Sequence, residues 1–271
     1  MPKYVDAAKD RIRKGLRRFV PILEKAKQSG LNEADTRTII KTMLEELLGY
    51  DKFFDVTAEF SIKGQYADFA VKIEDQIRFF IEAKAIGIEL DERHLFQVVG
   101  YAANHGHDWT VLTNGDEWKI FRLFSGPERR TEKVCTVRLT DPDVPPKDKV
   151  EHLFLVSKEG FRAKALESYW AKVEALHPKR LAQLLFQPKV LSLLGREVRR
   201  QAKSRVSDEQ VRDVLLNQVV RGSLADELKN GGMGRGKQTA PRRKNKTGGS
   251  KLERSGSMAP QDPSRGGSVK N

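Results

Sequence analysis

Apolar and polar positions alternate most regularly over residues 66–85, and this alternation predicts a β-hairpin with two different faces. Apolar side chains recur at every second position, the period of a half-buried strand: Ala67, Phe69, Val71, Ile73, Ile77, Phe79, Ile81 and Ala83. Residues 74–76 interrupt the alternation with polar side chains. The pattern therefore predicts a three-residue loop that places Ile73 opposite Ile77.

The polar face of this predicted hairpin carries two acids. The same register places Ala70 opposite Phe80 and Asp68 opposite Glu82, and directly opposed Cβ atoms are about 4.5–5.5 Å apart, so the acids repel. Lys84 lies two residues beyond Glu82 and projects from the same face. The pattern indicates a patch that a divalent cation would stabilise. Ordinary exposed charges, with Lys84 screening the acids, are the alternative.

Upstream, residues 4–28 have a loose apolar stripe that predicts a helix. Its other side is basic and includes Arg17 and Arg18. This basic surface is either a solvated helix face or a contact for a phosphate backbone.

A second helix is predicted after Gly30. Asn32 or Asp35 can cap its start, and Gly49 occupies the position that commonly follows a helix end. Residues 53–62 then predict a first strand leading into the hairpin.

Downstream of the hairpin, an amphipathic stretch from 91 to 103 predicts a helix with Gln97 and Tyr101 on one face. Asn114-Gly115 is a strong hairpin signal between two strand-like runs. The predicted strands in this part are 109–113, 117–124 and an edge strand at 134–139. The order of elements predicts an α/β sandwich, in which helices flank a mixed β-sheet.

The second half of the chain predicts helices only, with a helical pattern over 148–176 and further helices at 179–186, 188–203 and 207–221. From Leu228 onward Gly, Ser, Pro, Lys and Arg dominate, a composition typical of disorder. The sequence thus predicts four segments: a basic N-terminal helix (1–30), an α/β domain (31–142), a helical region (148–226) and a disordered basic tail (228–271).

Charge and cysteine content narrow the functional classes. The net charge is +13, but residues 229–271 contribute +9 of it, so basicity alone does not identify a nucleic-acid-binding domain. The single cysteine, Cys135, excludes an internal disulfide and a cysteine-rich zinc site. The chain shows neither a long apolar run nor a signal-peptide pattern, so we expect a cytoplasmic protein.

Together, these motifs resemble the PD-(D/E)xK nuclease superfamily, in particular the N-terminal nuclease domain of type I restriction enzyme R subunits and its stand-alone relatives. The resemblance covers about residues 30–124, and it implies a restriction-endonuclease-like sandwich and a nuclease-like domain over residues 31–142. The matching motifs are Asn32-Glu33-Ala34-Asp35-Thr36-Arg37, Leu48-Gly49-Tyr50-Asp51, Asp68, Glu82-Ala83-Lys84, Gln97-x-x-x-Tyr101, and Leu112-Thr113-Asn114-Gly115 with Trp118. Ala67 stands before the aspartate where the family often has proline, a variation that removes no ligand.

The resemblance implies a Mg²⁺ (or Mn²⁺) site held by Asp68, Glu82 and the backbone carbonyl of Ala83, a donor set suited to hard cations. An acid of the upstream helix often completes such sites. Glu33 matches the family pattern best, and Glu45 and Glu46 remain alternatives because the sequence does not fix the helix rotation.

Catalytic roles for Lys84, Gln97 and Tyr101 are also implied by the resemblance. Lys84 would orient a water molecule or stabilise negative charge, and Gln97 and Tyr101 would steady DNA or the lysine. Arg37, one turn after Glu33, could pair with that acid or with phosphate.

Two functions follow from the sequence as hypotheses. The first is a metal-dependent DNA endonuclease of the restriction or genome-defence type, with DNA and other restriction-system subunits as partners. The second is a nucleic-acid-binding or partner-binding module that keeps the nuclease fold without catalysis. The chain contains no Walker A motif, so we expect no ATP-driven translocation from it.

Overall fold

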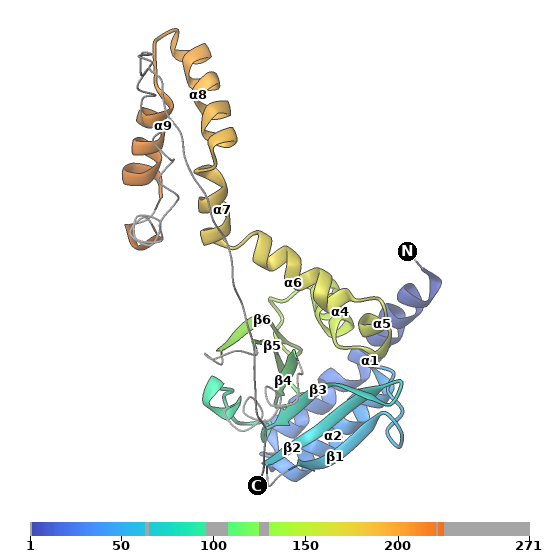
Figure 1. The fold of residues 1–271 in the computed structure, drawn as a ribbon. Helices are drawn as coiled ribbons and strands as arrows, with labels where there is room; N and C mark the ends of the chain where they lie inside the picture. Colours follow the sequence, from blue (N-terminus) through green and yellow to red (C-terminus); the bar gives the residue numbers. More distant parts are fainter. Residues whose placement is uncertain (1, 63–64, 96–107, 125–129, 221, 225–271) are drawn as a thin grey trace, which may run out of the picture. The chain divides into compact units, whose positions relative to one another are not determined.

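Six strands form one mixed sheet in the computed structural model, which describes residues 2–62, 65–95, 108–124, 130–220 and 222–224. The strands lie in chain order, and all neighbours are antiparallel except β3 and β4 (Figure 1). Their bounds are β1 Val56–Ile62, β2 Gln65–Ile73, β3 Gln76–Ala83, β4 Trp109–Thr113, β5 Glu117–Phe124 and β6 Arg130–Arg138. The predicted sandwich with a mixed sheet is confirmed.

Two helices, α1 (Lys3–Gln28) and α2 (Glu33–Glu46), pack on one face of this sheet (Figure 1). Asn32 is the cap of α2, because its side chain accepts a hydrogen bond from the Asp35 backbone N–H. The apolar stripe of α1 meets α2 and alternate residues of β3 in the main core, which includes Ile12, Phe19, Leu23, Ile40, Leu44, Phe79, Ile81 and Ala83. The helices thus bury one face of the central hairpin.

The opposite face of the sheet carries smaller apolar clusters. One contains Ala67, Ala70, Phe80 and Leu123, and another contains Leu90, Leu95, Leu112 and Phe121. Because side chains alternate along a strand, Glu82 projects from the same face as Phe80. Glu82 therefore projects away from the core that α1 and α2 cover.

The central hairpin differs from the prediction at its turn. Ile73 pairs with Gln76, not with Ile77, because Glu74 and Asp75 both have positive φ and form a two-residue turn. A bulge then leaves Arg78 as an extra residue, since Lys72 pairs with Ile77 and Val71 with Phe79. Consequently Ile77 packs with the Phe80 cluster and not with the main core. Beyond the bulge, the predicted pairing of Ala70 with Phe80 is confirmed.

The helices after the sheet are largely those predicted, although the pattern over 148–176 is divided into three. Their bounds are α4 Pro146–Leu155, α5 Lys158–Arg162, α6 Ala165–Ala175, α7 Pro178–Leu185, α8 Pro188–Ala202 and α9 Asp208–Val214, followed by a π-helical turn at Leu215–Val219. Val150, Leu153 and Leu166 of this region belong to the main core. Residues up to Val220 form one compact unit.

Some predictions fall outside the described residues. Of the helix predicted over 91–103, only a 3₁₀ turn at Glu92–Leu95 is described, and Gln97, Tyr101 and the basic tail lie outside the description. Among the described helices, none is long and apolar enough to cross a membrane.

Candidate nuclease site

Asp68 of β2 is held by one side-chain cation and one backbone amide. Arg37 of α2 donates a hydrogen bond from Nη1 to Asp68 Oδ1 at 3.0 Å. The backbone N–H of Ala83, at the end of β3, donates to Asp68 Oδ2 at 2.7 Å. Arg37 Nη1 also lies 3.9 Å from Glu59 Oε1. Of the two partners predicted for Arg37, Glu33 and phosphate, the acid that it pairs with in the structure is Asp68 and not Glu33.

Glu82 and Lys84 form a short ion pair beside that aspartate. Lys84 Nζ donates to Glu82 Oε1 at 2.6 Å and lies 3.8 Å from Glu33 Oε2. Glu82 is only 5% exposed, whereas the Glu33 side chain is 43% exposed. Lys84 therefore joins the buried acid of β3 to the first turn of α2.

Burial and charge shift the ionisation of this pair. Burial raises the pKa of Glu82, and the charges of Asp68 and Glu33 raise it further, against the opposing hydrogen bond from Lys84. Burial opposes the charge on Lys84, but the hydrogen bond to Glu82 and the surrounding acids outweigh it and raise the pKa of Lys84. The site thus combines an acid that resists ionisation with a firmly cationic lysine.

The other predicted residues separate into those near this site and those elsewhere. Glu33 is the acid of α2 that approaches Lys84, whereas Glu45 pairs with Lys52 and Glu46 pairs with Arg18. Arg18 also lies over the ring of Phe19. Arg17 is exposed on α1. The helix rotation that the sequence left open therefore favours Glu33.

Residues that were not predicted to belong to the site fix the backbone that follows Lys84. The Lys84 N–H donates to the carbonyl of Thr113 at 2.9 Å. The Ile86 N–H donates to the hydroxyl of Thr36 at 3.1 Å, and Thr36 is fully buried. Asn114 donates from Nδ2 to the carbonyls of Ile86 and Ile88. In the sequence, Thr36 and Asn114 lie within the motifs shared with the nuclease family, and Asn114 is also part of the predicted hairpin turn.

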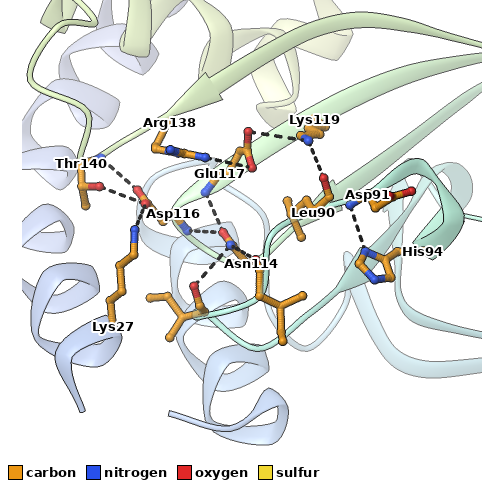
Figure 2. A network of polar contacts seen from close by, with 12 residues as sticks. Lys27, Leu90, Asp91, His94, Asn114, Asp116, Glu117, Lys119, Arg138 and Thr140 are labelled. Carbon is orange, nitrogen blue, oxygen red and sulfur yellow. Dashed lines mark hydrogen bonds and ion pairs between the residues drawn. The ribbon is translucent and has the colours of Figure 1, made fainter. Parts of the chain in front are cut away.

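A buried polar network extends from Asn114 along the same edge of the sheet (Figure 2). The Asp116 carboxylate accepts hydrogen bonds from the backbone and hydroxyl of Thr140, and Lys27 Nζ lies 3.7 Å away. Lys119 Nζ donates to the carbonyl of Leu90 at 2.7 Å. These contacts tie the β4–β5 hairpin to α1, to the residues that follow β6 and to the segment after β3.

Chemically, the site offers two neighbouring carboxylates with a cation against each. Among the described residues, no three His, Cys, Asp or Glu side chains are grouped so as to hold a metal ion by themselves. Asp68 and Glu82 form a pair of oxygen donors instead, and Lys84 can donate hydrogen bonds to an anionic oxygen. Such a set can bind a hard cation only if water or phosphate completes the coordination.

Comparison with known proteins gives one match. Residues 32–134 match the family model of the type I restriction enzyme R protein N terminus. The matched segment runs from the cap of α2 into β6 and includes Asp68, Glu82 and Lys84. The resemblance drawn from the motifs is confirmed over this segment, and membership of the PD-(D/E)xK superfamily is consistent with it. The comparison with curated proteins and that with solved structures each found no match.

Proposed function

We propose, from the restriction-type nuclease-like domain of residues 32–134, that this protein is a metal-dependent DNA endonuclease hydrolysing phosphodiester bonds. The observation that carries the proposal is the set of contacts that brings Asp68, Glu82 and Lys84 together at the end of β3, with Glu33 of α2 beside them. The type of domain favours DNA as the substrate and restriction-system subunits as partners.

The donor set fits Mg²⁺ or Mn²⁺. Mg²⁺ takes one or two carboxylates, keeps several waters and accepts phosphate oxygens. Asp68, Glu82 and the carbonyl of Ala83 would hold the ion, and Glu33 would reach it directly or through water. When bound, the ion would polarise the scissile phosphate and lower the pKa of a coordinated water.

The protein's own residues supply positioning and charge. Arg37 and the Ala83 N–H fix the two oxygens of Asp68, so its carboxylate orientation is set before substrate arrives. Lys84 stays cationic and can orient a water or stabilise negative charge on the phosphate. Roles for Gln97 and Tyr101 beside DNA, and phosphate contacts from Arg17, Arg18 and Arg37, remain part of the proposal.

The test is cleavage of plasmid DNA with Mg²⁺, with Mn²⁺ and with a chelator. Asp68→Asn, Glu82→Gln and Lys84→Met should each lower the rate at least about a hundredfold. Glu45→Gln and Glu46→Gln are matched controls, because they make the same change on acids of α2 that pair elsewhere. Cleavage by the three site variants at the wild-type rate would remove the proposal.

A non-catalytic DNA-binding or partner-binding module is the second candidate. It is favoured by the pairing of each site acid with a cation of the protein itself, Asp68 with Arg37 and Glu82 with Lys84. DNA binding that weakens steeply with salt, without turnover under any divalent metal, would support this candidate. Metal-dependent nicking that is lost in Asp68→Asn would exclude it.

A further inference from the structure

We infer that Asn114 is a positioning residue for Lys84, acting through the backbone that follows it; this inference rests on the proposed nuclease function. Asn114 is buried, 7% exposed, at the start of the β4–β5 turn. Its side chain spans from that turn to the segment that leaves β3 immediately after Lys84 (Figure 2).

The oxygen and the nitrogen of the Asn114 side-chain amide form hydrogen bonds with different segments of the backbone. Oδ1 accepts hydrogen bonds from the backbone N–H groups of Asp116 at 3.2 Å and Glu117 at 2.8 Å, which closes the turn. Nδ2 donates to the carbonyls of Ile86 at 3.3 Å and Ile88 at 2.9 Å. The acceptor therefore organises its own hairpin, while the donor holds a segment more than 25 residues earlier.

That segment needs such support because it leaves the sheet. β3 ends at Ala83, and the Lys84 N–H already bonds to Thr113, the residue before Asn114. Ile86 is then held on both sides, its N–H by the Thr36 hydroxyl and its carbonyl by Asn114. Buried backbone groups without partners are costly, so these contacts fix the path of the chain.

This path determines where the Lys84 ammonium can reach. Lys84 contacts Glu82 of β3 and Glu33 of α2, and Thr36 belongs to the same helix as Glu33. Loosening residues 84–88 would let the ammonium leave this position while strand β3 stays intact. Small misplacements of a reacting group can cost about a hundredfold in rate.

The experiment uses Asn114→Asp in the full chain. Aspartate keeps the acceptor for the turn but presents a second oxygen to the carbonyls of Ile86 and Ile88 in place of the donor. Hydrogen exchange measured by mass spectrometry should show that the backbone amides of residues 84–88 exchange at least tenfold faster than in the wild-type protein. The exchange rates of the β5 amides should not change. DNA cleavage should lose about 10- to 100-fold in kcat, while KM changes less than about twofold. Asn217→Asp makes the same change on an exposed side chain and should alter neither measurement.

A second variant removes the other side-chain hydrogen bond to Ile86, the one made by Thr36. Thr36→Val removes the hydroxyl that accepts from Ile86 and should give the same selective increase in exchange. Unchanged exchange over 84–88 in Asn114→Asp, or faster exchange with wild-type cleavage, would overturn the inference. Equal loosening of the whole sheet in both variants would also overturn it. If wild-type protein cleaves no DNA with any metal, the proposed function fails, whereas the exchange measurements still decide whether Asn114 holds this segment.

Discussion

Replacing Lys84 with methionine tests how strongly the buried Glu82 depends on its cation. Methionine keeps an unbranched apolar stem of similar length and removes the charge. Glu82 is 5% exposed and accepts a 2.6 Å hydrogen bond from Lys84. Leaving one member of a buried pair without its partner costs about 3–5 kcal/mol. Glu33 is much more exposed and loses only a 3.8 Å contact with Lys84, so the loss of this contact adds little to the destabilisation.

Protonation of Glu82 limits that cost and makes it depend on pH. Protonating a carboxyl group with the ordinary pKa of 4.5 at about pH 7.5 costs about 4 kcal/mol, at about 1.36 kcal/mol per unit. The pKa of Glu82 is raised in the folded protein, and losing Lys84 raises it further. The penalty is therefore absent below the ordinary pKa of 4.5, grows with pH above it, and levels off once the pH exceeds the raised pKa of the folded protein. We expect Lys84→Met to lower the free energy of unfolding by at most about 4 kcal/mol near pH 7.5 and by at most about 2 kcal/mol near pH 6.

Urea unfolding at several pH values, followed by the fluorescence of the buried tryptophans, measures this difference. Trp109 and Trp118 both belong to the main core and report its loss. Lys172→Met, at an exposed position of α6, is the control and should change stability little at any pH. A stability difference for Lys84→Met that does not vary between about pH 5 and pH 8 would refute this account of Glu82.

Three further predictions concern the contacts made by the chain from α4 to α5. Tyr50→Phe should cost about 1–3 kcal/mol in urea unfolding, because the buried carbonyl of Val156 loses its 2.9 Å hydrogen bond while ring packing is kept; no loss would contradict this role. Burial opposes ionisation of Glu159, but its hydrogen bonds from Arg11 prevail and lower the pKa of Glu159. Glu159→Gln should therefore cost about 1–3 kcal/mol at neutral pH, and this gap should close as pH falls below the ordinary value of 4.5; a gap that persists there would be evidence against it. Gly160→Ala should cost about 3 kcal/mol or more, because a Cβ would lie 1.8 Å from a backbone oxygen of α4; a wild-type melting temperature would disprove that crowding.

Part of the site could be predicted from the sequence because strand periodicity is strict. Alternation placed Asp68 and Glu82 on the same face as Ala70 and Phe80, and the pairing of Ala70 with Phe80 is confirmed. The turn was predicted wrongly because Glu74 and Asp75 are not the usual residues for positive φ. The bulge at Arg78 compensates for the shorter turn, so the pairings beyond it, as far as Phe69 with Ile81, keep the predicted register.

Contacts between distant segments could not be predicted. The choice among Glu33, Glu45 and Glu46 depends on the rotation of α2, which is set by packing against α1 and β3. Asn114 was recognised only as a turn signal, since local sequence shows that a residue favours a turn but not which distant carbonyls its side chain reaches. The pairing of Arg37 with Asp68 depends on the same helix placement.

The single parallel pair in the sheet has a consequence for how the protein folds. β1–β3 and β4–β6 are two antiparallel meanders whose pairings are mostly local, whereas the seam between them joins residues 30 positions apart, such as Phe80 and Thr110. Pairing distant residues requires closing a long loop, which costs entropy and delays the pairing. We therefore expect the two meanders to form first and the parallel β3–β4 pairing to form later. Lys84 receives its Thr113 contact only at that step. In pulse-labelled refolding, the Lys84 amide should gain protection after the hairpin amides; simultaneous protection would show that the halves do not assemble in this order.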